Sequence, residues 1–81
     1  MRVRVKLFAA ARELAGASEV AVDVQEGATI ADVERALLNE FPALAKIVPH
    51  ARWAVDAAFV AVDSNVTEQT EVALIPPVSG G

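Results

Sequence analysis

The fold is decided at the start of the chain, in MRVRVKLFAAARELAGASEVAVDV, residues 1–24. Val3, Val5 and Leu7 alternate here with basic residues, as in a strand that buries one face. Three valines between positions 20 and 24 alternate in the same way and predict a second strand. The segment that joins the two is too short for a wide crossover, so we expect the strands to lie close together.

The joining segment has the composition of a short helix. Residues Ala9–Ala15 have high helix propensity, with Leu14 as the large apolar residue. Gly16 stands where a left-handed residue would end a helix, because glycine has no Cβ to clash in that conformation. The opening stretch therefore predicts a strand, a short helix and a second strand.

A longer helix is predicted after a turn at residues 25–27. Thr29 is a good N-cap residue, and Asp32 lies three positions on, where a carboxylate favours the start of a helix. Apolar residues then recur at steps of three and four: Ile30, Val33, Leu37 and Phe41. Pro42 cannot continue a helix, so we expect this main helix to end just before it.

The second half of the chain returns to strand patterns after a loop at residues 42–52. The apolar side chains of that loop are expected to tuck beneath the main helix: Leu44, Ile47 and Val48. Short alternating runs around Trp53, residues 60–62 and Val72 predict three more strands, with a turn at residues 56–58. This order predicts an α+β fold, in which helices pack on one face of a mixed sheet of about five strands.

The composition excludes several kinds of site. The chain has no cysteine, so disulfides, thiolate metal sites and thiol nucleophiles are impossible. His50 is the single histidine and follows Pro49 in the expected loop, where a solvated side chain is the simplest interpretation. Carboxylates are scattered without a metal-binding spacing, and no glycine-rich phosphate loop is present. We therefore expect no bound metal or cofactor.

Charge and hydropathy narrow the partners and the location. The net charge is -4, which argues against nucleic acid as a partner. Hydrophobic residues make up 54% of the chain, yet no apolar run approaches the roughly 20 residues that span a bilayer. The basic start alternates with apolar residues, unlike a secretory signal, so we expect a cytoplasmic protein with no membrane partner.

Two motifs carry a resemblance to a known family. The segment LFAAARELAG, residues 7–16, and the ending PPVSGG, residues 76–81, are similar to segments of the small, sulfur-carrying subunit of molybdopterin synthase. The order of elements also resembles the β-grasp, or ubiquitin-like, fold of that family. The resemblance divides the chain into a β-grasp domain over residues 1–75 and an extended tail. The family often has Asn-Gly in the turn where this sequence has Asp56 and Ala57.

The resemblance implies that the chain carries sulfur on Gly81 and is no enzyme on its own. A ubiquitin-activating-like adenylyltransferase would use ATP to convert the terminal carboxylate into an acyl-adenylate. A sulfur donor would then leave a thiocarboxylate on Gly81. The large subunit of molybdopterin synthase, which binds the pterin substrate in a heterotetramer, would receive the tail. Two sulfur transfers to a cyclic pyranopterin precursor would build the dithiolene of molybdopterin.

The tail has the residues that delivery into a narrow channel requires. The expected insertion segment comprises Pro76, Pro77, Val78, Ser79 and Gly80, followed by the reactive Gly81. The glycines lack the Cβ that would crowd the reacting carbonyl. The prolines fix φ and have no N–H, so they end sheet pairing and hold an arm that reaches roughly 15 to 19 Å. The alternative is an unstructured or added terminus.

Strand alternation predicts a second site on the side of the sheet away from the helices. The residues expected to face the helices share one parity: Val3, Val5, Leu7, Val60, Val62, Val72 and Leu74. Phe8, Phe59 and Ile75 would then project elsewhere and form an uncovered apolar patch, beside the basic residues of the first strand. The resemblance implies that the large subunit docks there. The alternative is that loop residues cover these side chains.

Three other functions are compatible with the same patterns. A sulfur carrier for thiazole or another thiolated product shares the Gly-Gly chemistry but normally lacks the Pro-Pro-Val lead-in. A ubiquitin-like modifier would join Gly81 to lysines of target proteins. A pure interaction module would use the β-grasp surface, and its tail would do nothing chemical.

Overall fold

In a computed structural model, which describes residues 1–77, the two alternating stretches at the start of the chain pair as antiparallel strands. Strand β1 spans Arg2–Leu7 and strand β2 spans Glu19–Asp23. Val3 lies opposite Val22 in this register, and both side chains are buried. The valine alternation therefore places one face of both strands in the core, as predicted.

Helix α1, Ala9–Ala15, has the bounds that the sequence predicts. Gly16 follows in the left-handed conformation with a φ of 75°, and its N–H donates to the Arg12 carbonyl at 2.9 Å. Leu14 is exposed, and the buried residue of the helix is Ala11. The glycine cap closes this short helix and lets the chain return to the sheet as β2.

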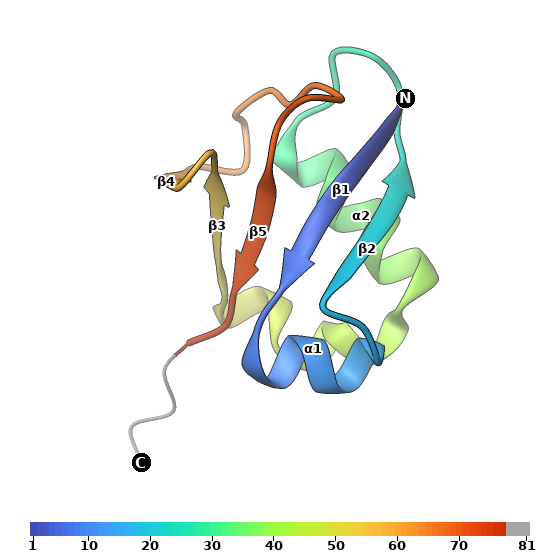
Figure 1. Ribbon diagram of the computed structural model, residues 1–81, viewed down its shortest axis with the longest axis vertical. Coiled ribbons are helices and arrows are strands. Elements are labelled where there is room, and N and C mark those ends of the chain that lie inside the picture. The colour runs from blue at the N-terminus through green and yellow to red at the C-terminus, as the bar shows by residue number, and fades with distance from the viewer. Residues whose placement is uncertain (78–81) are drawn as a thin grey trace.

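In the described part of the chain, the sheet has five strands in the order β2-β1-β5-β3-β4 (Figure 1). The three strands of the second half are β3 Arg52–Val55, β4 Ala58–Val60 and β5 Val72–Ile75. Strand β5 pairs parallel with β1 and antiparallel with β3. The strand that comes last in the sequence is therefore central, and the sheet is mixed, as predicted.

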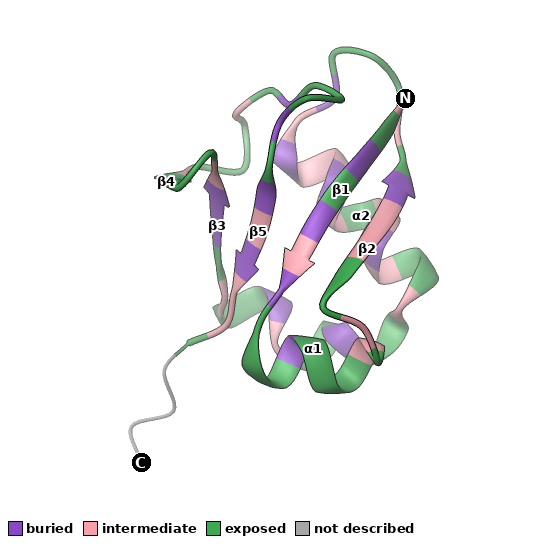
Figure 2. Ribbon diagram, in the orientation of Figure 1, coloured by how far each residue is buried: buried purple, intermediate pink, exposed green. Residues whose placement is uncertain are grey.

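Helix α2, Ile30–Glu40, covers the inner face of the sheet and ends before Pro42, as predicted (Figures 1 and 2). Its inward side chains pack with those of the strands in one core: Val3, Val5, Leu7, Val22, Ile30, Val33, Leu37, Val72 and Leu74. Trp53 of β3 is also buried, and its indole N–H donates to the Glu34 carboxylate at 3.2 Å. The polar end of the tryptophan is thus satisfied by the helix that covers it.

The start of α2 is fixed by Thr29 and Asp32, as predicted. The Asp32 carboxylate accepts hydrogen bonds from the Thr29 backbone N–H at 2.9 Å and from the Thr29 hydroxyl at 3.2 Å. The backbone hydrogen bond is the main reason why the pKa of Asp32 lies below its ordinary value. Arg35 adds an ion pair to the same carboxylate at 3.2 Å.

The segment between β4 and β5 departs from the prediction. Val62 was expected to face the helices from a strand, but β4 ends at Val60 and Val62 is 49% exposed. The Val62 carbonyl accepts from the Ala31 N–H at 2.9 Å, and the Ser64 carbonyl accepts from the Ile30 N–H at 2.9 Å. These N–H groups belong to the first turn of α2 and have no partner inside the helix. The segment caps α2 and does not continue the sheet.

Two 3-10 helices, η1 Pro42–Lys46 and η2 Val48–His50, stand where the sequence predicts an irregular loop. Leu44 and Val48 are buried and Ile47 is half-buried, so the predicted apolar anchors do pack into the core. The His50 side chain is exposed, as predicted for a solvated histidine. Packing of the anchors thus converts the loop into short helical turns.

This arrangement is the β-grasp fold: a mixed sheet that holds one main helix against its inner face. In Figure 1, α2 lies behind the sheet and α1 lies at its lower end, so neither helix covers the face toward the viewer. Within residues 1–77, no helix is both long enough and apolar enough to cross a membrane. The uncovered outer face is where the sequence predicts a patch.

Candidate functional site

The outer face of the sheet is hollowed over strands β5 and β3. The floor of this hollow includes Ala54 and Ala73, which lie opposite each other in the register of the two strands. Methyl side chains at both positions keep the floor low between larger neighbours. The result is a pocket of about 300 Å³ on the outer face of the sheet.

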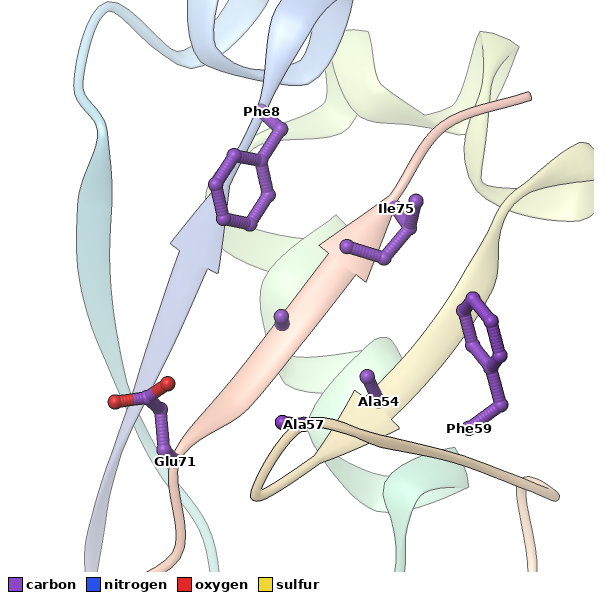
Figure 3. A pocket seen from close by; sticks show the side chains of 7 residues that line it. Phe8, Ala54, Ala57, Phe59, Glu71 and Ile75 are labelled. Atoms are coloured by element: carbon purple, nitrogen blue, oxygen red, sulfur yellow. The ribbon is translucent and has the colours of Figure 1, made fainter. Parts of the chain in front are cut away.

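Larger apolar side chains stand around this floor (Figure 3). Phe8 stands on the β1 side and is 45% exposed, whereas Phe59 stands on the β4 side and is 55% exposed. Ile75, at the end of β5, lies between them and is half-buried. We define the apolar patch as Phe8, Ala54, Phe59, Ala73 and Ile75. The structure thus brings the three predicted residues together, and their docking role stays a prediction.

The position of Phe8 follows from its place directly after β1. Leu7 is buried, and the backbone of Phe8 continues in an extended conformation with φ -127° and ψ 155°, which turns its side chain to the outer face. Ala9 then has a φ of 50°, and the chain enters α1. The Phe8 carbonyl accepts the Ala11 N–H at 3.0 Å. This hydrogen bond ties the wall of the patch to the first turn of the helix.

The position of Phe59 is set by a two-residue turn. Asp56 and Ala57 have φ values of 49° and 69°, so both are left-handed, as a tight hairpin between β3 and β4 requires. The turn therefore forms at the predicted place even though Ala57 replaces the usual glycine. Its length fixes the register that puts Phe59 opposite Ala54. The Asp56 carboxylate further accepts the Glu71 N–H at 3.0 Å and ties the turn to the start of β5.

Charged groups lie beside the apolar patch. Glu71 forms an ion pair with Lys6 at 3.3 Å, and the guanidinium carbon of Arg52 lies 3.8 Å from the centroid of the Phe59 ring. On the same side of the sheet, Arg2 pairs with Asp23 at 3.2 Å and lowers the pKa of that carboxyl group. The basic residues of β1 thus lie outside the core, as predicted, and two of them find partners within the chain.

The side chains of the apolar patch and its surroundings are suited to binding rather than to catalysis. Glu71 is the one carboxylate among the residues that line the pocket, and it is held by Lys6. Within residues 1–77, no group of His, Asp and Glu side chains could hold a metal ion. An exposed apolar hollow with aromatic walls is typical of a surface that packs against another protein.

The apolar patch adjoins the point where the tail leaves the sheet. Leu74 pairs with Leu7, directly before Phe8, and the next residue, Ile75, pairs with Arg52. Pro76 is half-buried and Pro77 is exposed. Strand β5 therefore connects the patch to the tail without any linker. The remaining residues of the expected insertion segment, with the reactive position, lie outside the described residues: Val78, Ser79, Gly80 and Gly81.

Comparison with known proteins identifies the family of this chain. The model of the ThiS family matches residues 5–81, which include the patch and the tail. The chain belongs to the ThiS family. This ThiS-family chain is 33% identical to a molybdopterin synthase sulfur carrier subunit of Caenorhabditis elegans, over 98% of this chain and 96% of the relative. It is 36% identical to small archaeal modifier protein 1 of Haloferax volcanii, over 94% and 97% of the two chains.

Solved structures of similar proteins agree with the fold. The crystal structure of SAMP1 from Haloferax volcanii superposes with a TM-score of 0.89 at 34% identity and covers 100% of both chains. A chain in a complex of subunits 1 and 2 of the molybdopterin-converting factor from Helicobacter pylori has a TM-score of 0.72 at 21% identity, again over 100% of both chains. At 21% identity, the similarity to the Helicobacter pylori chain supports only the β-grasp fold of the ThiS-family chain.

Sequence reasoning missed several residues of the site. The two alanines of the floor escaped notice because a search for large apolar side chains ignores small ones. Arg52 was also missed, although a signal was present. A two-residue turn at positions 56–57 places Phe59 opposite Ala54, and residue 52 is then its diagonal neighbour on the same face. Arginine and phenylalanine are both long enough to meet across that diagonal.

Proposed function

We propose that this chain is the sulfur carrier subunit of molybdopterin synthase, with its reactive group on Gly81. The observation that carries the proposal is the position of the apolar patch at the base of the PPVSGG tail. A protein that binds the patch receives the tail at a defined place. The ThiS-family match and the relative named as a molybdopterin synthase sulfur carrier support the same function.

The proposed chemistry begins with the carboxylate of Gly81. One carboxylate oxygen attacks the α-phosphate of ATP on an activating adenylyltransferase, and pyrophosphate leaves. Hydrosulfide supplied by a sulfur donor then attacks the acyl-adenylate carbonyl, the bond from that carbonyl to the AMP oxygen breaks, AMP leaves, and a thiocarboxylate remains. Glycine suits both steps because it leaves the reacting carbonyl uncrowded. A chain without cysteine has no thiol that could carry the sulfur instead.

In the second half of the proposed cycle, the apolar patch docks on the large subunit of molybdopterin synthase. Pro76 and Pro77 cannot extend the sheet, so they direct the tail away from β5 and into the partner. The thiocarboxylate sulfur there attacks a cyclic pyranopterin held mainly by the large subunit. Water then hydrolyses the bond between this sulfur and the Gly81 carbonyl, so the sulfur stays on the pterin and the carboxylate of Gly81 is regenerated for another round.

Mass spectrometry tests the proposal directly. The chain is incubated with ATP, a ubiquitin-activating-like adenylyltransferase and a sulfur donor, and the expected product has one oxygen replaced by sulfur at Gly81. A chain that lacks Gly81 is the control, because it should bind the large subunit nearly as tightly and yet transfer no sulfur. Absence of the mass change with matched enzymes, or full synthase activity without Gly81, would contradict the proposal.

A second candidate is a protein modifier, which the similarity to small archaeal modifier protein 1 favours. In that case the same acyl-adenylate is attacked by a lysine amine of a target protein, and an isopeptide bond forms. Immunoblots of cells that express the tagged chain would then show high-mass conjugates that vanish when Gly81 is removed. Restoration of molybdopterin synthesis in a deficient strain without such conjugates supports the carrier function alone.

A further inference from the structure

Arg52 lies at the rim of the apolar patch, where the tail leaves the sheet. It pairs with Ile75 in the register of β3 and β5, and its guanidinium carbon lies 3.8 Å from the centroid of the Phe59 ring. The cation–π attraction favours this position of the flexible arginine side chain. A positive charge is therefore fixed on an aromatic ring that is itself 55% exposed.

The stacked guanidinium keeps hydrogen-bond donors available. Its N–H groups lie in the plane of the group, so a ring against one flat side leaves the edges open. Arg2, Lys6 and Arg35 each form an ion pair with a carboxylate of the chain. Arg52 has no such pair within residues 1–77. Its charge is presented outward, next to the apolar patch.

A protein that covers Phe59 must also accommodate Arg52. The two side chains are in contact, so burial of the ring removes water from the guanidinium group. Loss of that water is strongly unfavourable unless a hydrogen-bonding partner replaces it. A carboxylate does so best, because its two oxygens match the fork of N–H groups on arginine.

We propose that Arg52 is a specificity-determining residue of the apolar patch, which pairs with an aspartate or glutamate side chain of the docking partner. This inference rests on the proposed function, because it takes the large synthase subunit as the protein that covers the patch. Apolar contact is not directional, so an apolar patch alone would let the partner dock in several orientations. A charge pair at the base of the tail selects the rotation that sends Pro76 and Pro77 toward the partner's channel.

Calorimetric titration against the large subunit from the same organism, at several salt concentrations, tests the inference. Arg52→Ala is expected to weaken binding about 10- to 100-fold and to flatten its dependence on salt. Arg52→Glu should weaken binding further, because it sets two negative charges against each other. Arg52→Lys should fall between Arg52→Ala and the native chain, because an ammonium keeps the charge and loses the fork.

A matched control separates a local effect from a change in net charge. Lys46→Ala removes the same charge from η1, on the helical side of the molecule, and should bind like the native chain. Thermal melts of each free variant establish that it is folded. Arg52→Ala that binds as tightly as the native chain, or more tightly, would overturn the inference, because Arg52 would then only shield Phe59. If the native chain itself fails to bind, the proposed function fails and this inference with it.

Discussion

Both faces of the sheet carry apolar side chains, yet only the inner face is covered by a helix. On the inner face, Leu74 is fully buried under α2, whereas its neighbour Ile75 is half-buried on the outer face. The inner face is built from valines, leucines and Trp53, whose side chains are all buried in the core. The outer face sets small alanines between Phe8 and Phe59, which leaves a hollow. The inner face therefore forms the core, whereas the outer face combines an apolar hollow with charged neighbours, as a binding surface does.

The largest expected effect comes from the inner face. Leu74→Ala should lower the free energy of unfolding by about 2 to 5 kcal/mol, because it removes buried methyl groups and leaves a cavity. Ile75→Ala, one residue later, should cost about 1 kcal/mol or less, because the side chain keeps contact with water in the native fold. Urea titration followed by the fluorescence of Trp53, the single tryptophan, measures both. If both variants lost the same free energy of unfolding, the outer face would contribute as much to stability as the inner face, which would contradict this comparison.

An effect of similar size is expected on the outer face, but on association. Phe59→Asp should weaken binding to the large subunit by about 2 to 5 kcal/mol, because the complex loses the apolar ring and must bury a carboxylate that competes with the partner for Arg52. The free variant should stay folded, since Phe59 is 55% exposed. Calorimetric titration together with a thermal melt separates the two quantities. A variant that melts early while its affinity per folded molecule is unchanged would show that Phe59 serves the fold.

The smallest expected effect concerns the turn at the rim of the apolar patch. Ala57→Gly should raise the free energy of unfolding by about 0.5 to 1 kcal/mol, because a left-handed alanine is strained and glycine is not. Ala58→Gly is the matched control in β4, where glycine should destabilise the chain. Both are measured by urea titration. A loss of stability in Ala57→Gly would mean that the methyl group contributes more through contacts than it costs in strain.

Most of the fold was predictable because local signals agree with the tertiary structure. The bounds of α1, the Gly16 cap and the Thr29 start of α2 each depend on residues close together in the sequence. Strand alternation correctly predicted that Phe8 and Phe59 lie outside the core, because a side chain next to an inward-facing one in a strand must point outward. Resemblance to a family added the β-grasp fold, whereas the order β2-β1-β5-β3-β4 was not predicted, because alternation does not show which strands are neighbours.

The errors have a common physical cause, which is competition from distant parts of the chain. Val62 has the alternation of a strand residue, but its carbonyl is used to cap α2, a helix that begins more than 30 positions earlier. Leu14 has the size of a core residue, yet the buried contact of α1 is made by Ala11. The stack of Arg52 on Phe59 likewise depends on a register that only the complete hairpin defines.

The central place of β5 has a consequence for how the protein is made. Among the strands of residues 1–77, β5 is synthesised last, yet it joins the β1–β2 pair to the β3–β4 pair. The sheet cannot close while Val72–Ile75 are still inside the ribosome, so the β1–β2 pair and the β3–β4 pair remain unjoined until β5 has emerged. A message cut short before β5 yields a chain that cannot fold and is open to proteolysis. Synthesis of a folded domain is thereby coupled to synthesis of the strand that bears the tail.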